Sequence, residues 1–93
     1  MKFRNKKVTV LIDVRSRLEF FFGHMPGAVC IPVTKINEAA LESRGIARDA
    51  SILVYCASGS RSAMAVRALK QAGYKRVVDG GGLANVRRNL AED

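Results

Sequence analysis

The segment SILVYC, residues 51–56, is an unbroken run of mostly apolar residues. Its length suits a β-strand, and a continuous apolar run is typical of a strand that is buried on both faces of a parallel sheet. Cys56 ends the run, and the small and polar residues ASGS, 57–60, separate it from Arg61. The segment therefore predicts a central strand that carries a cysteine at its carboxyl end.

Further strand-like and helix-like segments alternate on both sides of this run. Residues 8–13, 27–33 and 76–79 are expected to form strands. Helices are expected after Ser16, which with Glu19 has the spacing of a capping box, after Thr34 as a second cap, and from about Arg61 to Gly73. Residues 80–82, GGG, indicate a turn, and 83–90 a short final helix. This alternation predicts one α/β domain, residues 1–93, with a mostly parallel sheet.

The loop after Cys56 has the composition of an anion cradle. In parallel sheets, ligands bind beyond the carboxyl ends of the strands, where this loop is expected. Small side chains let backbone N–H groups point inward, the following helix adds its positive end, and Gly59 permits an unusual backbone conformation. Arg61 adds a charge and a fork of donors. These groups favour the thiolate, so we expect the pKa of Cys56 to lie below the free value of about 8.5.

The cradle supplies the candidate binding residues for an anionic substrate. Ser62 can donate a further hydrogen bond to that anion or cap the helix that starts here. A buried structural cysteine is the alternative to a reactive one, but such a residue would not need this loop. The expected site has Cys56 as the nucleophile and the following residues as its binding loop: Ala57, Ser58, Gly59, Ser60, Arg61 and Ser62.

The chain is strongly basic, with 16 Lys and Arg against 8 Asp and Glu and a formal charge of +8. Such a surface attracts small anions or an acidic partner protein, although a solvated basic face is the simpler interpretation. We expect neither nucleic acid nor a membrane as a partner. No run approaches the roughly 20 apolar residues of a membrane helix. Without a signal peptide, the protein is expected in the cytoplasm, where Cys30 and Cys56 stay reduced.

Three ordered motifs resemble the rhodanese (thiosulfate sulfurtransferase) family in its single-domain form. They are LIDVRS with EFFFGHMPGAVCIP, then VYCASGSRS, and finally GYKRVVDGGGLANV. The resemblance covers nearly the whole chain and implies a small, mostly parallel central sheet with helices on both faces. It also implies that Cys56 takes the outer sulfur of thiosulfate, releases sulfite, and passes its persulfide sulfur to a thiol or cyanide. No metal or organic cofactor is implied.

Several other functions share this loop or this fold. A sulfur-relay carrier would receive its persulfide sulfur from a partner protein, with the basic surface as the docking site. A non-catalytic rhodanese-like module usually lacks the cysteine that this chain keeps. Related cysteine phosphatases and arsenate reductases have five residues between cysteine and arginine, whereas this chain has four. A tighter loop suits a sulfane sulfur better than a tetrahedral phosphate.

Other residues are expected to support the site. Asp13 and Arg15 follow the first strand and should lie at the same sheet edge as Cys56, where they can order the loop by hydrogen bonds or a salt bridge. A direct role of Arg15 in substrate binding is the alternative. His24 is expected in a structural turn, with a role as a base as the alternative. Cys30 is expected as a small buried residue, with resolution of the persulfide as a disulfide as the alternative. Residues 80–82 should let the backbone turn close to the site. Arg87 and Arg88 are expected on a solvated helix face, with a docking patch as the alternative.

Overall fold

The central element of the fold is strand β5, Ser51–Cys56, in a four-stranded sheet of order β4-β3-β5-β6. The structure is a computed structural model that describes residues 1–92. Strands β3, Val10–Asp13, and β6, Arg76–Gly82, flank β5, and β4, Val29–Cys30, forms one edge. All three pairings are parallel, so the carboxyl ends of the strands meet at one edge of the sheet.

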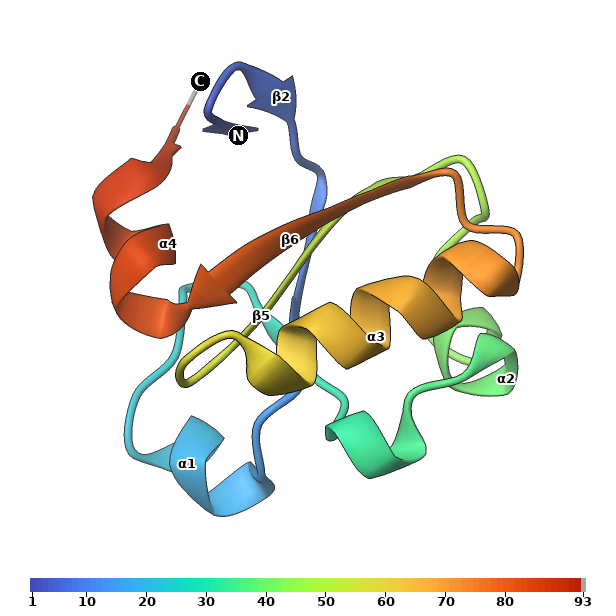
Figure 1. Ribbon diagram of the computed structural model, residues 1–93, viewed down its shortest axis with the longest axis horizontal. Coiled ribbons are helices and arrows are strands. Elements are labelled where there is room, and N and C mark those ends of the chain that lie inside the picture. Colours follow the sequence, from blue (N-terminus) through green and yellow to red (C-terminus); the bar gives the residue numbers. More distant parts are fainter. Residues whose placement is uncertain (93) are drawn as a thin grey trace.

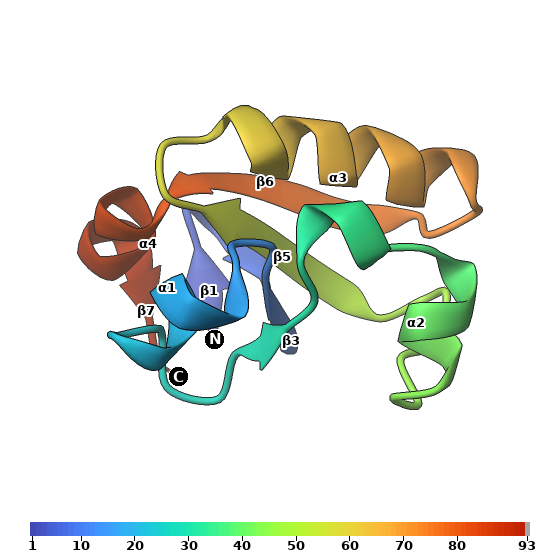
Figure 2. The same ribbon diagram turned by 90° about the horizontal axis from the view of Figure 1, so that it is seen from below.

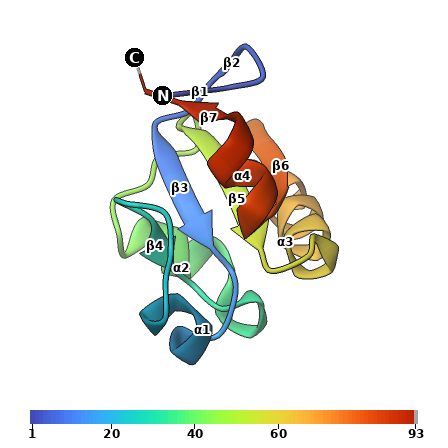
Figure 3. The ribbon, with the colours of Figure 1, turned by 90° about the vertical axis from the view of Figure 1, so that its left-hand side faces the viewer.

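Helices cover both faces of this sheet. Helices α2, Glu38–Glu42, and α3, Ser60–Gln71, lie on one face, and α4, Leu83–Asn89, lies on the other (Figures 2 and 3). Helix α1, Arg17–Phe21, lies beside the loop that joins β5 to α3 (Figure 1), and the 3-10 helix η1, Val33–Lys35, precedes α2. The predicted α/β fold is confirmed. Within residues 1–92, no helix has the length and apolarity that crossing a membrane requires.

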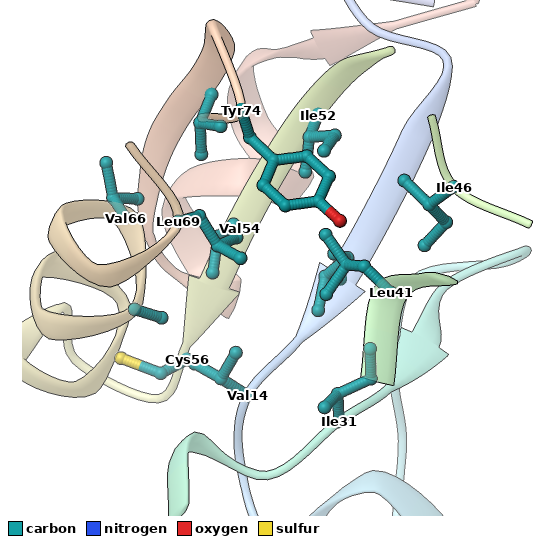
Figure 4. Close-up of a cluster of buried hydrophobic side chains, with 13 residues drawn as sticks. Val14, Ile31, Leu41, Ile46, Ile52, Val54, Cys56, Val66, Leu69 and Tyr74 are labelled. Atoms are coloured by element: carbon teal, nitrogen blue, oxygen red, sulfur yellow. The ribbon is translucent and has the colours of Figure 1, made fainter. Parts of the chain in front are cut away.

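Alternate side chains of β5 enter two separate cores. Ile52, Val54 and Cys56 belong to the cluster under α2 and α3, whereas Leu53 and Tyr55 pack with Val86 of α4. This alternation follows from the two-residue period of a strand. Figure 4 shows the first cluster, with Cys56 beside Val14 at the end that faces the first turn of α3. The packing on both faces fixes the position of Cys56.

A second, antiparallel sheet joins the two ends of the chain. Its order is β2-β1-β7, formed by Lys6–Lys7, Lys2–Phe3 and Leu90–Ala91. The sequence does not predict this sheet, because strands of two residues are too short to show a periodic pattern. The available signal was Phe3, an aromatic residue among cations, which is buried in the cluster around Val86.

Three local predictions were wrong. Asn37, not Thr34, caps α2: its side chain accepts a hydrogen bond from the N–H of Ala40, while Thr34 lies in η1. The strand expected at 27–33 is only Val29–Cys30, because the backbone turns into η1 after Pro32. The predicted glycine turn at 80–82 is instead the last part of β6, where the register with β5 shifts so that Val54 pairs with Asp79 and Tyr55 with Gly81.

Helix α1 forms where the capping box predicts it, but its apolar side chains stay exposed. Ser16 accepts from the N–H of Glu19, and the Glu19 carboxylate accepts from the N–H of Ser16. Leu18, Phe21 and Phe22 are 67%, 78% and 78% exposed. The capping box therefore predicted the helix correctly without indicating whether its apolar side chains are buried.

Candidate active site

Cys56 lies where the carboxyl ends of three strands meet. It is the last residue of β5 and pairs with Gly82 of β6, while Asp13 at the end of β3 pairs with Tyr55. Its side chain is fully buried at the base of the loop 57–60. Ala57, Ser58 and Ser60 are exposed in that loop, and Gly59 is half-buried. The loop therefore separates the sulfur from solvent.

Two backbone N–H groups point at the sulfur, as the cradle prediction requires. The N–H of Gly59 donates to Sγ of Cys56 at 2.9 Å, and the N–H of Ser62, in the first turn of α3, donates at 3.4 Å. Burial alone would raise the pKa of Cys56, but hydrogen bonds to the sulfur, led by those from the backbone N–H groups of Ser62 and Gly59, together outweigh burial, so the pKa lies below the ordinary value. Gly59 adopts a φ of 110°, a conformation that favours glycine.

The Ser62 hydroxyl is used by Asp79. Its Oγ donates to Oδ1 of Asp79 at 2.7 Å and lies 2.9 Å from the carbonyl oxygen of Gly59. A hydrogen bond from this hydroxyl to the sulfur would also lower the pKa of Cys56. A hydroxyl has only one proton to donate, however, and the Asp79 carboxylate is the stronger acceptor, so the proton points to Asp79 and not to the sulfur. The backbone N–H groups therefore stabilise the thiolate. Ser62 Oγ instead ties α3 to β6.

Arg61 turns its guanidinium toward helix α1. Its two terminal nitrogens donate to the two carboxylate oxygens of Glu19 at 2.7 and 3.0 Å. The hydrogen bond from Arg61 is the largest of the effects that lower the pKa of Glu19 to about 2. The ion pair thus persists at neutral pH, and anion binding by Arg61 stays a prediction. Sequence reasoning missed Glu19 as a site residue, because its capping-box spacing gave it a sufficient local role.

Asp13 and Arg15 form a buried ion pair beside the site. The guanidinium of Arg15 donates to both carboxylate oxygens of Asp13 at distances of 2.8–3.1 Å, and its Nη2 also donates to the carbonyl oxygen of Gly23 at 2.6 Å. The side chains are 8% and 0% exposed for Arg15 and Asp13. The pair therefore holds the segment after α1 against the end of β3, which is the salt bridge that the sequence suggested.

The glycines at the end of β6 pack directly against the loop. A β-carbon on Gly82 would lie 2.5 Å from the carbonyl oxygen of Ala57, and one on Gly59 would lie 3.7 Å from Cα of Gly81. Asp79 helps to hold this glycine backbone in place, because its carboxylate accepts a hydrogen bond from the N–H of Gly81. The expectation that residues 80–82 bring the backbone close to the site is confirmed, although they do so as a bulged strand.

His24 and Cys30 have the structural surroundings that the sequence suggested. The His24 ring stacks on Phe20, with centroids 3.5 Å apart, and its Nδ1 donates to the carbonyl oxygen of Phe20 at 2.8 Å. Cys30 is buried, and its Sγ lies 3.8 Å from the carbonyl oxygen of Arg15. Burial is the largest cause of its raised pKa. The two cysteines therefore have opposite pKa shifts.

The chain matches a known protein family over most of its length. The family described as Rhodanese-like domain matches residues 1–85. The chain belongs to this family. A relative named "Putative sulfur carrier protein YrkF", from Bacillus subtilis, is 36% identical over 74% of this chain. A "Sulfurtransferase" from Allochromatium vinosum is 36% identical over 87% of this chain. This rhodanese-like chain spans 36% of the Bacillus protein and 75% of the Allochromatium protein.

Solved rhodanese structures share the fold. A rhodanese from E. coli, described with anions, has a TM-score of 0.75 and 30% identity, and the match covers 82% of this chain and 88% of that one. The human single-domain sulfurtransferase TSTD1 has a TM-score of 0.68 and 25% identity, over 89% and 84% of the two chains. The fold of this chain, with its parallel sheet and covering helices, is thus the rhodanese-like fold.

One group of cations gathers at a distance from Cys56. A hollow of about 420 Å³ is lined by cations from three segments: Lys6, Lys7, Lys70, Lys75 and Arg76. Ser51, which begins β5, also lines it, so the hollow lies at the amino ends of the strands. Arg87 and Arg88 are exposed on α4, as expected. The cations of the hollow thus lie at the opposite end of β5 from Cys56.

Proposed function

We propose that this rhodanese-like chain is a sulfurtransferase that carries a sulfane sulfur as a persulfide on Cys56. Thiosulfate, or a donor with similar chemistry, supplies the sulfur, and a thiol or cyanide accepts it. The observation that carries the proposal is the pair of N–H groups, from Gly59 and Ser62, on a cysteine sulfur at the end of a buried strand. Such donors stabilise negative charge on sulfur before the reaction and after it.

The reaction proceeds in two displacements. In the first, the Cys56 thiolate attacks the outer sulfur of thiosulfate, a new S–S bond forms, and the old S–S bond breaks with sulfite leaving. In the second, the acceptor attacks the outer sulfur of the persulfide, and the Cys56 thiolate leaves with its electron pair. The negative charge stays at the same N–H groups throughout, so no metal or organic cofactor takes part.

The burial of Cys56 sets a condition on both displacements. Its side chain has no exposed surface, so part of the loop 57–60 must move to admit a donor. The exposed residues Ala57 and Ser58 are the ones that can move without disturbing a core. Gly59 and Ser62 stay attached to the sulfur from the helix side.

A sulfur-relay carrier is the second candidate. It shares the chemistry and differs only in the donor, which would be the persulfide of a partner protein. The name of the Bacillus relative, a putative sulfur carrier protein, supports this candidate. The position of the basic hollow limits it, because a partner docked there would lie at the other end of β5, about 17 Å from Cys56 at the usual rise per residue. A delivering partner would have to dock at the α1 end.

Two alternatives have less support. A non-catalytic module would not need a thiolate with two N–H donors. A phosphatase needs a cation that faces the bound phosphate, whereas the guanidinium of Arg61 is paired with Glu19. The loop of this chain is also one residue shorter than the phosphatase loop. Each alternative predicts its own result: no sulfur transfer for the module, and aryl phosphate hydrolysis for the phosphatase.

The experiment measures thiocyanate formation from cyanide, with thiosulfate or with a persulfide-loaded donor enzyme as the sulfur source. The sulfurtransferase predicts turnover with thiosulfate that is lost in Cys56→Ser and kept in Cys30→Ser. The relay predicts turnover only with the loaded enzyme. Turnover with neither source would leave the interaction module, and hydrolysis of an aryl phosphate would indicate the phosphatase.

A further inference from the structure

The ion pair between Arg61 and Glu19 determines the charge at the mouth of the loop. The side chains of residues 57–60 are uncharged, so Arg61 is the cation that the loop sequence offers to a donor. Both terminal nitrogens of its guanidinium are bound to Glu19, and the two side chains are 33% and 34% exposed. The positive charge is thus largely cancelled at a site that borders solvent.

The charge of Arg61 interacts with the Cys56 sulfur. Among the effects that raise the pKa of Arg61 is the electrostatic attraction of Cys56, after the larger contribution of Glu19. A second carboxylate, that of Asp79, is linked to the site through Ser62. The Ser62 hydroxyl donates to this carboxylate, while the Ser62 N–H donates to the Cys56 sulfur. Although the chain has a formal charge of +8, Arg61, Glu19 and Asp79 together bring no net positive charge to the nucleophile.

We propose that Glu19 sets the donor preference of Cys56 by neutralising Arg61, so that singly charged sulfane donors are favoured over dianionic thiosulfate. The inference rests on the sulfurtransferase function proposed above. Singly charged donors include organic persulfides and thiosulfonates. With either, the Cys56 thiolate bonds to the outer sulfur, the S–S bond of the donor breaks, and the leaving thiolate or sulfinate keeps the electron pair. Glu19 is a positioning residue, because it acts through Arg61.

Two donors isolate the effect of charge. Thiosulfate carries two negative charges and methanethiosulfonate one, while both present a terminal sulfur bonded to an oxidised sulfur. The quantity to measure is the ratio of kcat/KM for thiosulfate to that for methanethiosulfonate, with cyanide as the acceptor. A change that only loosens the loop lowers both values and leaves their ratio unchanged.

Glu19→Gln keeps the shape of the side chain and an oxygen for the N–H of Ser16, but frees the charge of Arg61. We expect the ratio to rise about tenfold, the size of one added charge-assisted contact in a partly exposed site. Arg61→Gln leaves Glu19 uncompensated and should lower the ratio. The double variant restores a neutral pair, so its ratio should return to that of the wild type. The ratio would then follow the net charge of the pair and not the number of hydrogen bonds.

Two controls separate charge from structure. Ser16→Ala removes the side-chain cap of α1 and leaves Glu19 paired with Arg61, so the ratio should not change. Glu42→Gln makes the same chemical change at another exposed ion pair, between Glu42 of α2 and Arg48, and should also leave the ratio unchanged. If Glu19→Gln loads with both donors at the wild-type ratio, the inference is overturned. If neither donor loads the wild type, the proposed function itself fails.

Discussion

The backbone at Gly82 lies so close to Ala57 that a β-carbon on Gly82 would stand 2.5 Å from the Ala57 carbonyl oxygen. That distance is too short for two non-bonded heavy atoms, so an added methyl group must displace the loop that holds the N–H groups on Cys56. Gly82 has a φ of −86°, which any residue adopts. The restriction is therefore steric alone.

Gly82→Ala should lose both stability and sulfur transfer. Overpacking of this kind costs about 1–3 kcal/mol of unfolding free energy, which urea unfolding will measure. Transfer per folded molecule should fall because the loop shifts. Gly45→Ala is the matched control: its φ of 71° makes alanine strained, but nothing lies within 4 Å of the new methyl group. It should lose stability and keep its activity. Normal activity in folded Gly82→Ala would contradict the assigned role of this contact.

The pKa of Cys56 is open to direct titration. In a Cys30→Ser background, the rate of alkylation by iodoacetamide should reach half its maximum below about pH 8.5, the ordinary thiol value. The rate falls as pH drops below this midpoint, because the thiolate is the reactive form. In urea the midpoint should return to about 8.5, since the N–H donors are lost. A folded-state midpoint above the unfolded one would mean that burial, not hydrogen bonding, controls the sulfur.

The sign of this shift fixes how stability depends on pH. The folded pKa lies below the unfolded one, so the contribution of Cys56 is fully present above the unfolded pKa and is lost as pH falls through the folded pKa. The difference in unfolding free energy between Cys30→Ser and the Cys30→Ser/Cys56→Ser double variant should therefore be larger at pH 9.5 than at pH 6, by urea unfolding. Equal differences at the two pH values would contradict the lowered pKa.

Ser62→Ala tests which groups stabilise the thiolate. The variant keeps the N–H of residue 62 and removes the hydroxyl, which is bound to Asp79. We expect a loss of about 1 kcal/mol of stability, the usual value of one hydrogen bond. The alkylation midpoint of Cys56 should move by less than about 1 pH unit. A larger rise would show that the hydroxyl donates to the sulfur after all.

Arg15→Met tests whether Arg15 supports the fold or binds the donor. The substitution leaves the buried Asp13 carboxylate without its partner, and breaking such a pair costs about 3–5 kcal/mol. We expect a large loss of stability by urea unfolding and, in the fraction that stays folded, a KM for thiosulfate close to that of the wild type. Little loss of stability together with a raised KM would instead make Arg15 a donor-binding residue.

The sequence predicted the parts of the fold whose signals are local and periodic. The apolar run 51–56, the capping box at Ser16 and the helix expected from about Arg61 to Gly73 each correspond to an observed element. It did not predict the sheet β2-β1-β7, which depends on contacts between residues about 90 positions apart and has strands too short for a pattern. The aromatic residue Phe3 was the available sign of buried structure near the N-terminus, but it lies among Lys and Arg residues.

The candidate site was predictable where it depends on the backbone, and unpredictable where side chains from distant segments meet. Gly59 and Ser62 follow Cys56 closely, so their N–H groups could be expected at the sulfur. Glu19 is 42 residues from Arg61, and only the fold brings them together. Asp79 ends a predicted strand, which places it at the right sheet edge, but its bond to Ser62 depends on how α3 packs on β6.

The most direct test of the central claim is the intact mass of the protein after one round of loading. The protein is incubated with thiosulfate or methanethiosulfonate without an acceptor, and Cys56→Ser and Cys30→Ser are treated in parallel. The account predicts a gain of one sulfur, about 32 Da, on the wild type and Cys30→Ser, reversed by cyanide and absent from Cys56→Ser. A gain that survives in Cys56→Ser, or no gain on the wild type with either donor, would contradict it.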